Sequence, residues 1–137
     1  MGSRRQGRVI AFQSLYRYDI SGAELRELLD FSWIDKPKLI RIPEDAIAFA
    51  RLIITGTIQN INVIDKTIQN QLEHWDISRL ARVDLAILRI SVYCLLYQPD
   101  IPSTVTIDEA IDIGRDYGTD ESYRFINGVL DGINKSR

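Results

Sequence analysis

The sequence lacks several features that would point to secretion or a membrane. Its 137 residues include one cysteine, Cys94, so no disulfide can form within the chain, which suits a reducing compartment. No apolar segment follows the N-terminal arginines as a secretory signal requires, and no apolar run reaches the ~20 residues of a membrane span. We therefore expect a cytoplasmic protein without a membrane partner, and Cys94, in apolar surroundings, as a core residue.

The sequence also lacks the marks of catalysis and of bulk nucleic-acid binding. The 17 basic and 19 acidic residues give a formal net charge of -2, so any nucleic-acid site must be a local patch. His74 is the single histidine and has no cysteine near it in sequence, so no metal site is expected. Neither a Gly-rich phosphate loop nor a nucleophile motif occurs. We expect no catalytic residues, no cofactor and no enzymatic activity.

What the sequence does contain is helical patterning. Hydrophobic residues make up 45% and charged residues 26%, a globular composition, and no segment alternates at period two. We predict an all-α fold of about seven helices in one domain spanning residues 1–137. The expected helices cover about residues 4–19, 23–33, 43–54, 58–71, 76–97, 106–118 and 119–133, with a loop over 35–42 and a weakened pattern at 55–57.

Capping residues set several of these expected boundaries. Asp76 or Ser78 should cap the fifth helix. Thr106 should begin the sixth, because Glu109 completes a capping box with it. Gly118 should end that helix in the left-handed conformation.

A basic cluster occupies the first 18 residues, which hold no acid and four arginines: Arg4, Arg5, Arg8 and Arg17. Spacings of three, four and four place the following residues on one side of the first helix: Arg5, Arg8, Phe12 and Tyr16. Exposed arginines bind phosphates and stack on bases, and Tyr16 could add an aromatic platform. The alternative is a solvated N-terminus with both aromatic residues in the core. We assign Phe12 to the core in either case.

An acidic segment lies near the C-terminus. Residues 108–121 hold six acids against one base, Arg115, a net charge of -5. RNA should avoid this face. A basic protein partner or simple solvation would account for it.

Three stretches together resemble the NusB family of bacterial transcription antitermination factors. They are RRQGR leading into FQSLY (residues 4–16), RL followed by DLAILRISVY (79–93), and IP, VTIDEA and FINGVL (101–130). Their order and spacing cover nearly the whole chain, whereas residues 30–74 match only in pattern. The resemblance implies two small helical bundles packed together. It also implies binding of a single-stranded boxA-type RNA jointly with NusE, a small-subunit ribosomal protein.

The resemblance further implies a role in the RNA polymerase antitermination complex, promoting read-through in ribosomal RNA operons. It implies RNA contacts for Arg4, Arg5, Arg8 and Tyr16, and partner contacts for Tyr16 and Asp84. For Asp84, an ion pair with a nearby arginine is the alternative.

Two further residues match a family position that meets RNA. Phe125 occupies that position, and Arg124 beside it could contact phosphate. The alternative is a core phenylalanine, because Phe125 and Val129 have i,i+4 spacing.

The chain departs from the family pattern near its N-terminus. Gln6 and Gly7 stand where another arginine and a helix former are common. A glycine costs a helix interior roughly 0.5–1 kcal/mol relative to alanine, so we expect the arginine segment to be partly frayed.

Two other functions are compatible with the sequence. The chain could be the RNA-binding part of an RNA cytosine methyltransferase, or it could be a homodimeric helical interaction protein.

Overall fold

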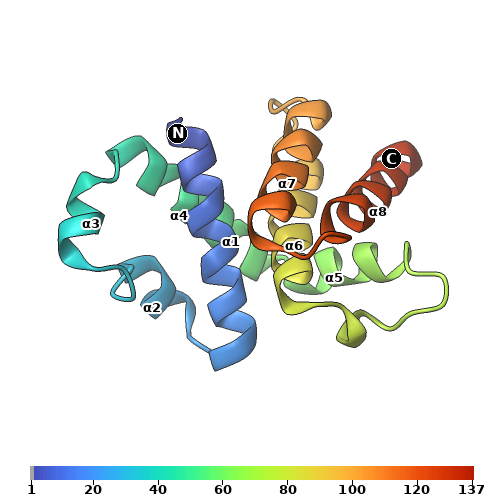
Figure 1. Cartoon of the computed structure of the whole chain (residues 1–137), viewed down its shortest axis with the longest axis horizontal. Coiled ribbons are helices and arrows are strands. Elements are labelled where there is room, and N and C mark those ends of the chain that lie inside the picture. Colours follow the sequence, from blue (N-terminus) through green and yellow to red (C-terminus); the bar gives the residue numbers. More distant parts are fainter. Residues whose placement is uncertain (1) are drawn as a thin grey trace.

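The computed structural model describes residues 2–137, and the regular elements of this part of the chain are all helices, without a strand (Figure 1). The all-α prediction is confirmed, with eight α-helices and one 3-10 turn in the described residues rather than about seven helices. The helices are α1 (Ser3–Ser21), α2 (Leu25–Asp30), α3 (Lys36–Arg41), α4 (Glu44–Gln59), α5 (Ile61–Gln69), α6 (Arg82–Tyr97), α7 (Ser103–Tyr117) and α8 (Ser122–Ser136), and the 3-10 turn η1 is Ile77–Arg79.

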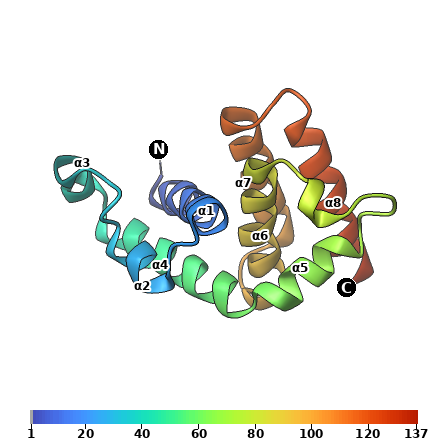
Figure 2. The same cartoon turned by 90° about the horizontal axis from the view of Figure 1, so that it is seen from below.

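The helices form two bundles joined through α1. Helix α1 packs with α2 and α4 in the first bundle, and α6, α7, α8 and α5 pack together in the second. Figures 1 and 2 show α1 between the two groups, and it contacts both α4 and α6. The predicted pair of small bundles is confirmed.

The core extends through both bundles. Helix α6 is its central element, because every residue from Asp84 to Leu95 is buried. Most of these residues are apolar, as expected for a helix surrounded by protein on all sides. One cluster of buried apolar side chains therefore reaches from α1 and α4 to α8.

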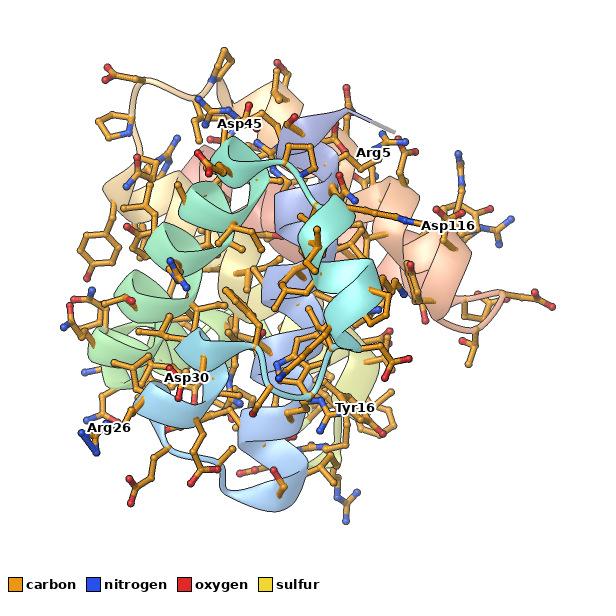
Figure 3. All side chains as sticks on the ribbon, turned by 90° about the vertical axis from the view of Figure 1, so that its left-hand side faces the viewer. Arg5, Tyr16, Arg26, Asp30, Asp45 and Asp116 are labelled. Carbon is orange, nitrogen blue, oxygen red and sulfur yellow. The ribbon has the colours of Figure 1, made fainter. Side chains whose placement is uncertain are left out.

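The expected loop over residues 35–42 is wrong, because α3 forms within it. Pro37 occupies one of the first two helical positions, where a missing N–H costs nothing because that group has no intrahelical acceptor. The proline therefore helps begin α3. This short helix lies over the side of α1 in Figure 3.

Helix α4 continues through the segment 55–57, where a weaker pattern was expected. A Cβ atom at Gly56 would overlap the ring of Tyr93 on α6, so the glycine allows close packing of these helices. The helix ends at Gln59, and the next residue, Asn60, caps it: its side-chain amide donates to the Gly56 carbonyl at 2.8 Å. Among the described residues no single helix is long and apolar enough to cross a membrane. The pair α4 and α5, bent by 75°, meets that length and composition only when joined.

Helix α6 begins at Arg82, later than predicted. Asp76 is indeed a cap, but of the 3-10 turn: its carboxylate accepts a hydrogen bond from the backbone N–H of Ser78 at 2.9 Å. The guanidinium of Arg82 donates to the carbonyl of Ser78 at 2.9 Å and to that of Leu80 at 2.8 Å. These contacts fix the turn that leads into α6.

Helix α7 begins at Ser103, one turn earlier than the capping-box pattern predicted. Pro102 precedes it in an extended conformation, and Thr106 is a buried residue inside the helix. The left-handed conformation expected at Gly118 is also wrong, since its φ is -94°. The start of α7 is therefore decided by tertiary packing, which buries Thr106, rather than by local capping.

Candidate RNA and partner interface

The side of α1 predicted to carry the functional residues faces the second bundle. Arg5 donates from Nε to Glu109 at 2.8 Å and from a terminal nitrogen to Asp112 at 2.5 Å, both on α7. The hydrogen bond to Glu109 is the main reason that the pKa of Arg5 is raised. The Arg5 side chain is 37% exposed, so it lies at the surface but is already paired with acids.

Arg8 lies inside the protein, so the expectation that it is exposed is wrong. Arg8 is 7% exposed, and together with Cys94 and Thr106 it lines a small cavity between α1, α6 and α7. Burial lowers the pKa of its guanidinium, which lies 5.0 Å from the centre of the Phe49 ring. Neither a hydrogen bond nor an ion pair joins the Arg8 side chain to another described residue. A phosphate contact by Arg8 would require this side chain to move.

Besides Arg17, which is exposed near the end of α1, the exposed cation of the cluster is Arg4. Its guanidinium lies 4.4 Å from the centre of the Phe49 ring on α4. The helix is unbroken from Ser3 through Gly7, so the predicted fraying is not what the structure shows. A Cβ atom at Gly7 would lie 2.8 Å from the carbonyl oxygen of Ala46, so this glycine lets α1 approach α4 closely.

The two aromatic residues of α1 have different surroundings. Phe12 is 4% exposed, and its ring centre lies 5.1 Å from that of Tyr117 on α7, which confirms its core assignment. Tyr16 is 37% exposed and borders a cavity of about 550 Å³. Tyr16 therefore leaves part of its aromatic side chain open to solvent at the edge of this cavity.

That cavity belongs to a longer depression, which we name the α1 groove. A second cavity of about 290 Å³ continues it toward the N-terminal half of α1, as far as Gln6. Four residues line both cavities: Gln13, Trp33, Lys38 and Tyr117. Figure 3 looks onto this side of the molecule and labels Arg5 and Tyr16 toward opposite ends of α1. The groove therefore connects the neighbourhood of the arginine cluster with that of Tyr16.

Asp84 lies in the first turn of α6, next to Val83, which lines the groove near Tyr16. The residue is 8% exposed, and its Oδ1 is buried without a hydrogen-bond partner. The alternative of an ion pair with an arginine is wrong, since no basic group within residues 2–137 pairs with it. The helix N-terminus favours this negative charge, but one carboxylate oxygen stays unsatisfied.

The nearby arginines of α6 are committed elsewhere. Arg82 pairs with Asp19 at 3.1 Å, and Arg89 makes two hydrogen bonds of 2.9 Å to Asp65. Asp19 also lies 3.8 Å from Arg89. This network joins α1, α5 and α6 beside Asp84. Its partners are far apart in sequence, so no local pattern predicted it.

Arg124 and Phe125 lie on α8, apart from the α1 arginines. Arg124 is exposed and donates from Nε to the hydroxyl of Tyr123 at 3.1 Å, which raises its pKa. The guanidinium of Arg115 lies 4.6 Å from the centre of the same Tyr123 ring. Phe125 is half-buried and packs against the core, so the side chain is neither fully in the core nor fully exposed. In residues 2–137 no side-chain hydrogen bond or ion pair links these residues to α1.

Chemistry-bearing side chains are otherwise sparse in the described chain. Residues 2–137 contain no group of three or more His, Cys, Asp or Glu side chains that could hold a metal ion. Cys94 is a buried free thiol, as expected, and burial raises its pKa to about 11.

Comparisons with known proteins match nearly the whole chain to one family. The model of the NusB family matches residues 5–135. A transcription antitermination protein NusB from Treponema denticola is 52% identical over 134 residues, covering 97% of each chain. The NusB protein of Treponema pallidum strain Nichols is 46% identical over 133 residues, covering 97% of this chain and 93% of its own.

Solved structures of NusB proteins also match this chain over nearly its whole length. T. maritima NusB superposes with a TM-score of 0.86 at 38% identity, covering 98% of this chain and 92% of its own. A crystal structure of antitermination factors NusB and NusE in complex with dsRNA matches with a TM-score of 0.82 at 25% identity, covering 98% of each chain.

Proposed function

This chain belongs to the NusB family, and we propose that it is a transcription antitermination factor that binds boxA-type single-stranded RNA together with NusE. Through the RNA polymerase antitermination complex it promotes read-through in ribosomal RNA operons, in the cytoplasm. The observation that carries this proposal is the near-full-length similarity to proteins named as antitermination factors rather than enzymes. The fold shared with the NusB of a NusB–NusE–dsRNA complex supports both partners.

The two alternatives are less well supported. A methyltransferase would carry a further catalytic domain, whereas the curated relatives are covered over 97% and 93% of their own lengths. A homodimer that hides the basic cluster would bind RNA less well as protein concentration rises. Sedimentation velocity at the concentrations used for RNA binding separates a homodimer from a monomer.

The RNA end of the proposed interface is the start of α1. Arg4 is exposed, and Arg5 lies beside it with part of its guanidinium at the surface. An arginine presents five N–H donors, so Arg5 keeps donors for a phosphate beyond those that Glu109 and Asp112 accept. Arg124 and Phe125 on α8 provide a separate second contact.

The partner end of the proposed interface is formed by Tyr16 and Asp84. A buried acceptor without a donor costs roughly 1–3 kcal/mol. The Oδ1 atom of Asp84 is such an acceptor, so a basic side chain of NusE that reached it would recover that cost. The exposed ring of Tyr16 adds an apolar surface near it.

Fluorescence anisotropy of labelled RNA tests this proposal. The probes are a boxA-like single strand, a scrambled single strand and a duplex of the boxA sequence, each titrated with and without NusE. We expect the boxA single strand to bind best, and NusE to tighten its binding. Equal affinity for all three RNAs in the presence of NusE contradicts the proposed function. The duplex probe matters because the matching solved complex contains dsRNA.

The salt dependence of binding tests the arginine contacts. For single strands, log affinity falls with log salt by about 0.7 per neutralised phosphate. The Arg4→Ala/Arg5→Ala variant should therefore have a slope that is smaller by about 1.4. Arg26→Ala is the matched control, because Arg26 is an exposed arginine on α2 that lines neither cavity of the groove (Figure 3). An unchanged slope in the double variant would remove these residues from the RNA site.

A further inference from the structure

The α1 groove has a charge opposite to that of the whole chain. Its larger cavity is lined by two cations, Arg17 and Lys38, and by no acid. The whole chain carries a net charge of -2. The single acid of the smaller cavity is Asp35. An anionic chain fits this cavity better than a basic protein segment does.

Trp33 is held in a fixed position on the wall of this groove. It lies in the turn between α2 and α3, between Phe31 and Ile34, which are 1% and 9% exposed and anchor the turn in the core. The turn is closed by a hydrogen bond of 3.0 Å from the Ile34 N–H to the Phe31 carbonyl. The guanidinium of Arg17 lies 4.8 Å from the centre of the Trp33 ring. Trp33 thus positions a flat cation at the edge of the cavity.

The groove also offers the groups that read a base. Aromatic rings and arginine planes stack on unpaired bases, and free amides bond their edges. Tyr16 and Tyr117 are exposed rings at its sides, and the side-chain amides of Gln6 and Gln13 make no hydrogen bond to another described residue. The indole Nε1 of Trp33 also has no acceptor, but this atom is buried, so it is the ring of Trp33 that is offered to a base.

We propose that the α1 groove binds one or more bases of the single-stranded RNA, with Trp33 and Arg17 as the stacking platform and Lys38 contacting phosphate. This inference rests on the proposed function and extends it to the α2–α3 segment. The groove reaches from Gln6, next to Arg5, to Tyr16. A strand held by the arginines at the start of α1 can therefore continue along it.

The two tryptophans of the chain allow a direct test. Trp75 is 60% exposed in the loop after α5 and lines neither cavity, so a Trp75→Phe variant reports on Trp33 alone. Adding boxA-like RNA should quench Trp33 fluorescence, with the same midpoint as the anisotropy titration. In the matched Trp33→Phe variant, the fluorescence of Trp75 should stay unchanged.

Affinity gives the second readout. Loss of one stacked base corresponds to roughly a 5- to 150-fold weaker RNA affinity, and we expect that loss for Trp33→Leu and none for Trp75→Leu. If Trp33→Leu does not fold, Lys38→Gln serves instead: it should lower the salt slope by about 0.7, while Lys36→Gln on the same helix should not. Lys36 and Lys38 are both exposed, and only Lys38 lines the groove.

The outcomes separate this inference from the proposed function. RNA binding without quenching of Trp33, and with normal affinity in the groove variants, overturns the groove proposal alone. Quenching by NusE in the absence of RNA overturns it as well, because the groove is then a protein site. Failure of the unmodified chain to bind boxA-like RNA with NusE refutes the proposed function itself.

Discussion

Removing the acids that hold Arg5 should strengthen RNA binding. Arg5 is bonded to Glu109 at 2.8 Å and to Asp112 at 2.5 Å, so these carboxylates compete with RNA phosphate for the same cation. They also repel a phosphate that approaches Arg5. The double variant Glu109→Gln/Asp112→Asn removes both effects and keeps the shape of the side chains.

The exposure of the three side chains sets the size of the expected gain in RNA affinity. They are 37%, 21% and 41% exposed for Arg5, Glu109 and Asp112, so solvent screens both pairs. Pairs of this kind contribute roughly 0.2–1 kcal/mol each. Relief of both pairs should therefore tighten RNA binding by about 2- to 30-fold, and either single substitution should tighten it by less.

The assay is RNA anisotropy at fixed salt, with a charge-matched control. Asp108→Asn makes the same change in net charge as either single substitution, on the same helix, but Asp108 is exposed and makes no ion pair in the described chain. A double variant that binds RNA no more tightly refutes competition. A tighter complex with Asp108→Asn, equal to that with Asp112→Asn, shows a general charge effect instead.

Three further substitutions test the packing and the partner end. Gly7→Ala should lower the free energy of unfolding by about 1–2 kcal/mol in urea, because overpacking against the Ala46 carbonyl exceeds the gain in helix propensity; a more stable variant contradicts this. The pKa of Cys94 is raised to about 11 from 9.0 by burial, so the folded state holds this proton more tightly. Its stability contribution is complete below pH 9 and falls by about 2–3 kcal/mol as pH rises toward 11. Cys94→Ala should lose less stability over that range, and equal losses exclude the thiol. Asp84→Asn should weaken NusE binding while Asp100→Asn, an exposed acid beyond the other end of α6, should not; equal binding by the two variants excludes Asp84 from the partner site.

Patterns within one helix predicted much of the fold. The all-α class, the two bundles implied by the family resemblance and the burial of Phe12 are all confirmed. Each depends on helical periodicity or on motifs that span nearly the whole chain. Arg5, Arg8, Phe12 and Tyr16 do share the side of α1 that faces the second bundle, as their spacing predicted.

The features that the sequence did not predict depend on contacts between residues that lie far apart in the chain. Arg8 is buried because helices from both bundles meet around it, and α4 passes through Gly56 because Tyr93 packs there. Asp84 lacks an arginine partner because Arg82 and Arg89 pair with acids of α1 and α5. Such tertiary contacts do not produce a pattern at a fixed sequence spacing, so periodicity could not predict them. The α1 groove escaped prediction for the same reason, since one of its walls is formed by the short helix α3.

The central claim is that RNA and NusE bind this chain as one coupled assembly. Calorimetry of all four legs of the binding cycle tests it most directly, using boxA-like single-stranded RNA and NusE. We expect NusE to tighten RNA binding by roughly 5- to 150-fold, and RNA to tighten the contact with NusE by the same factor, as linkage requires. Equal RNA affinity with and without NusE would contradict joint binding, even if the chain bound RNA alone.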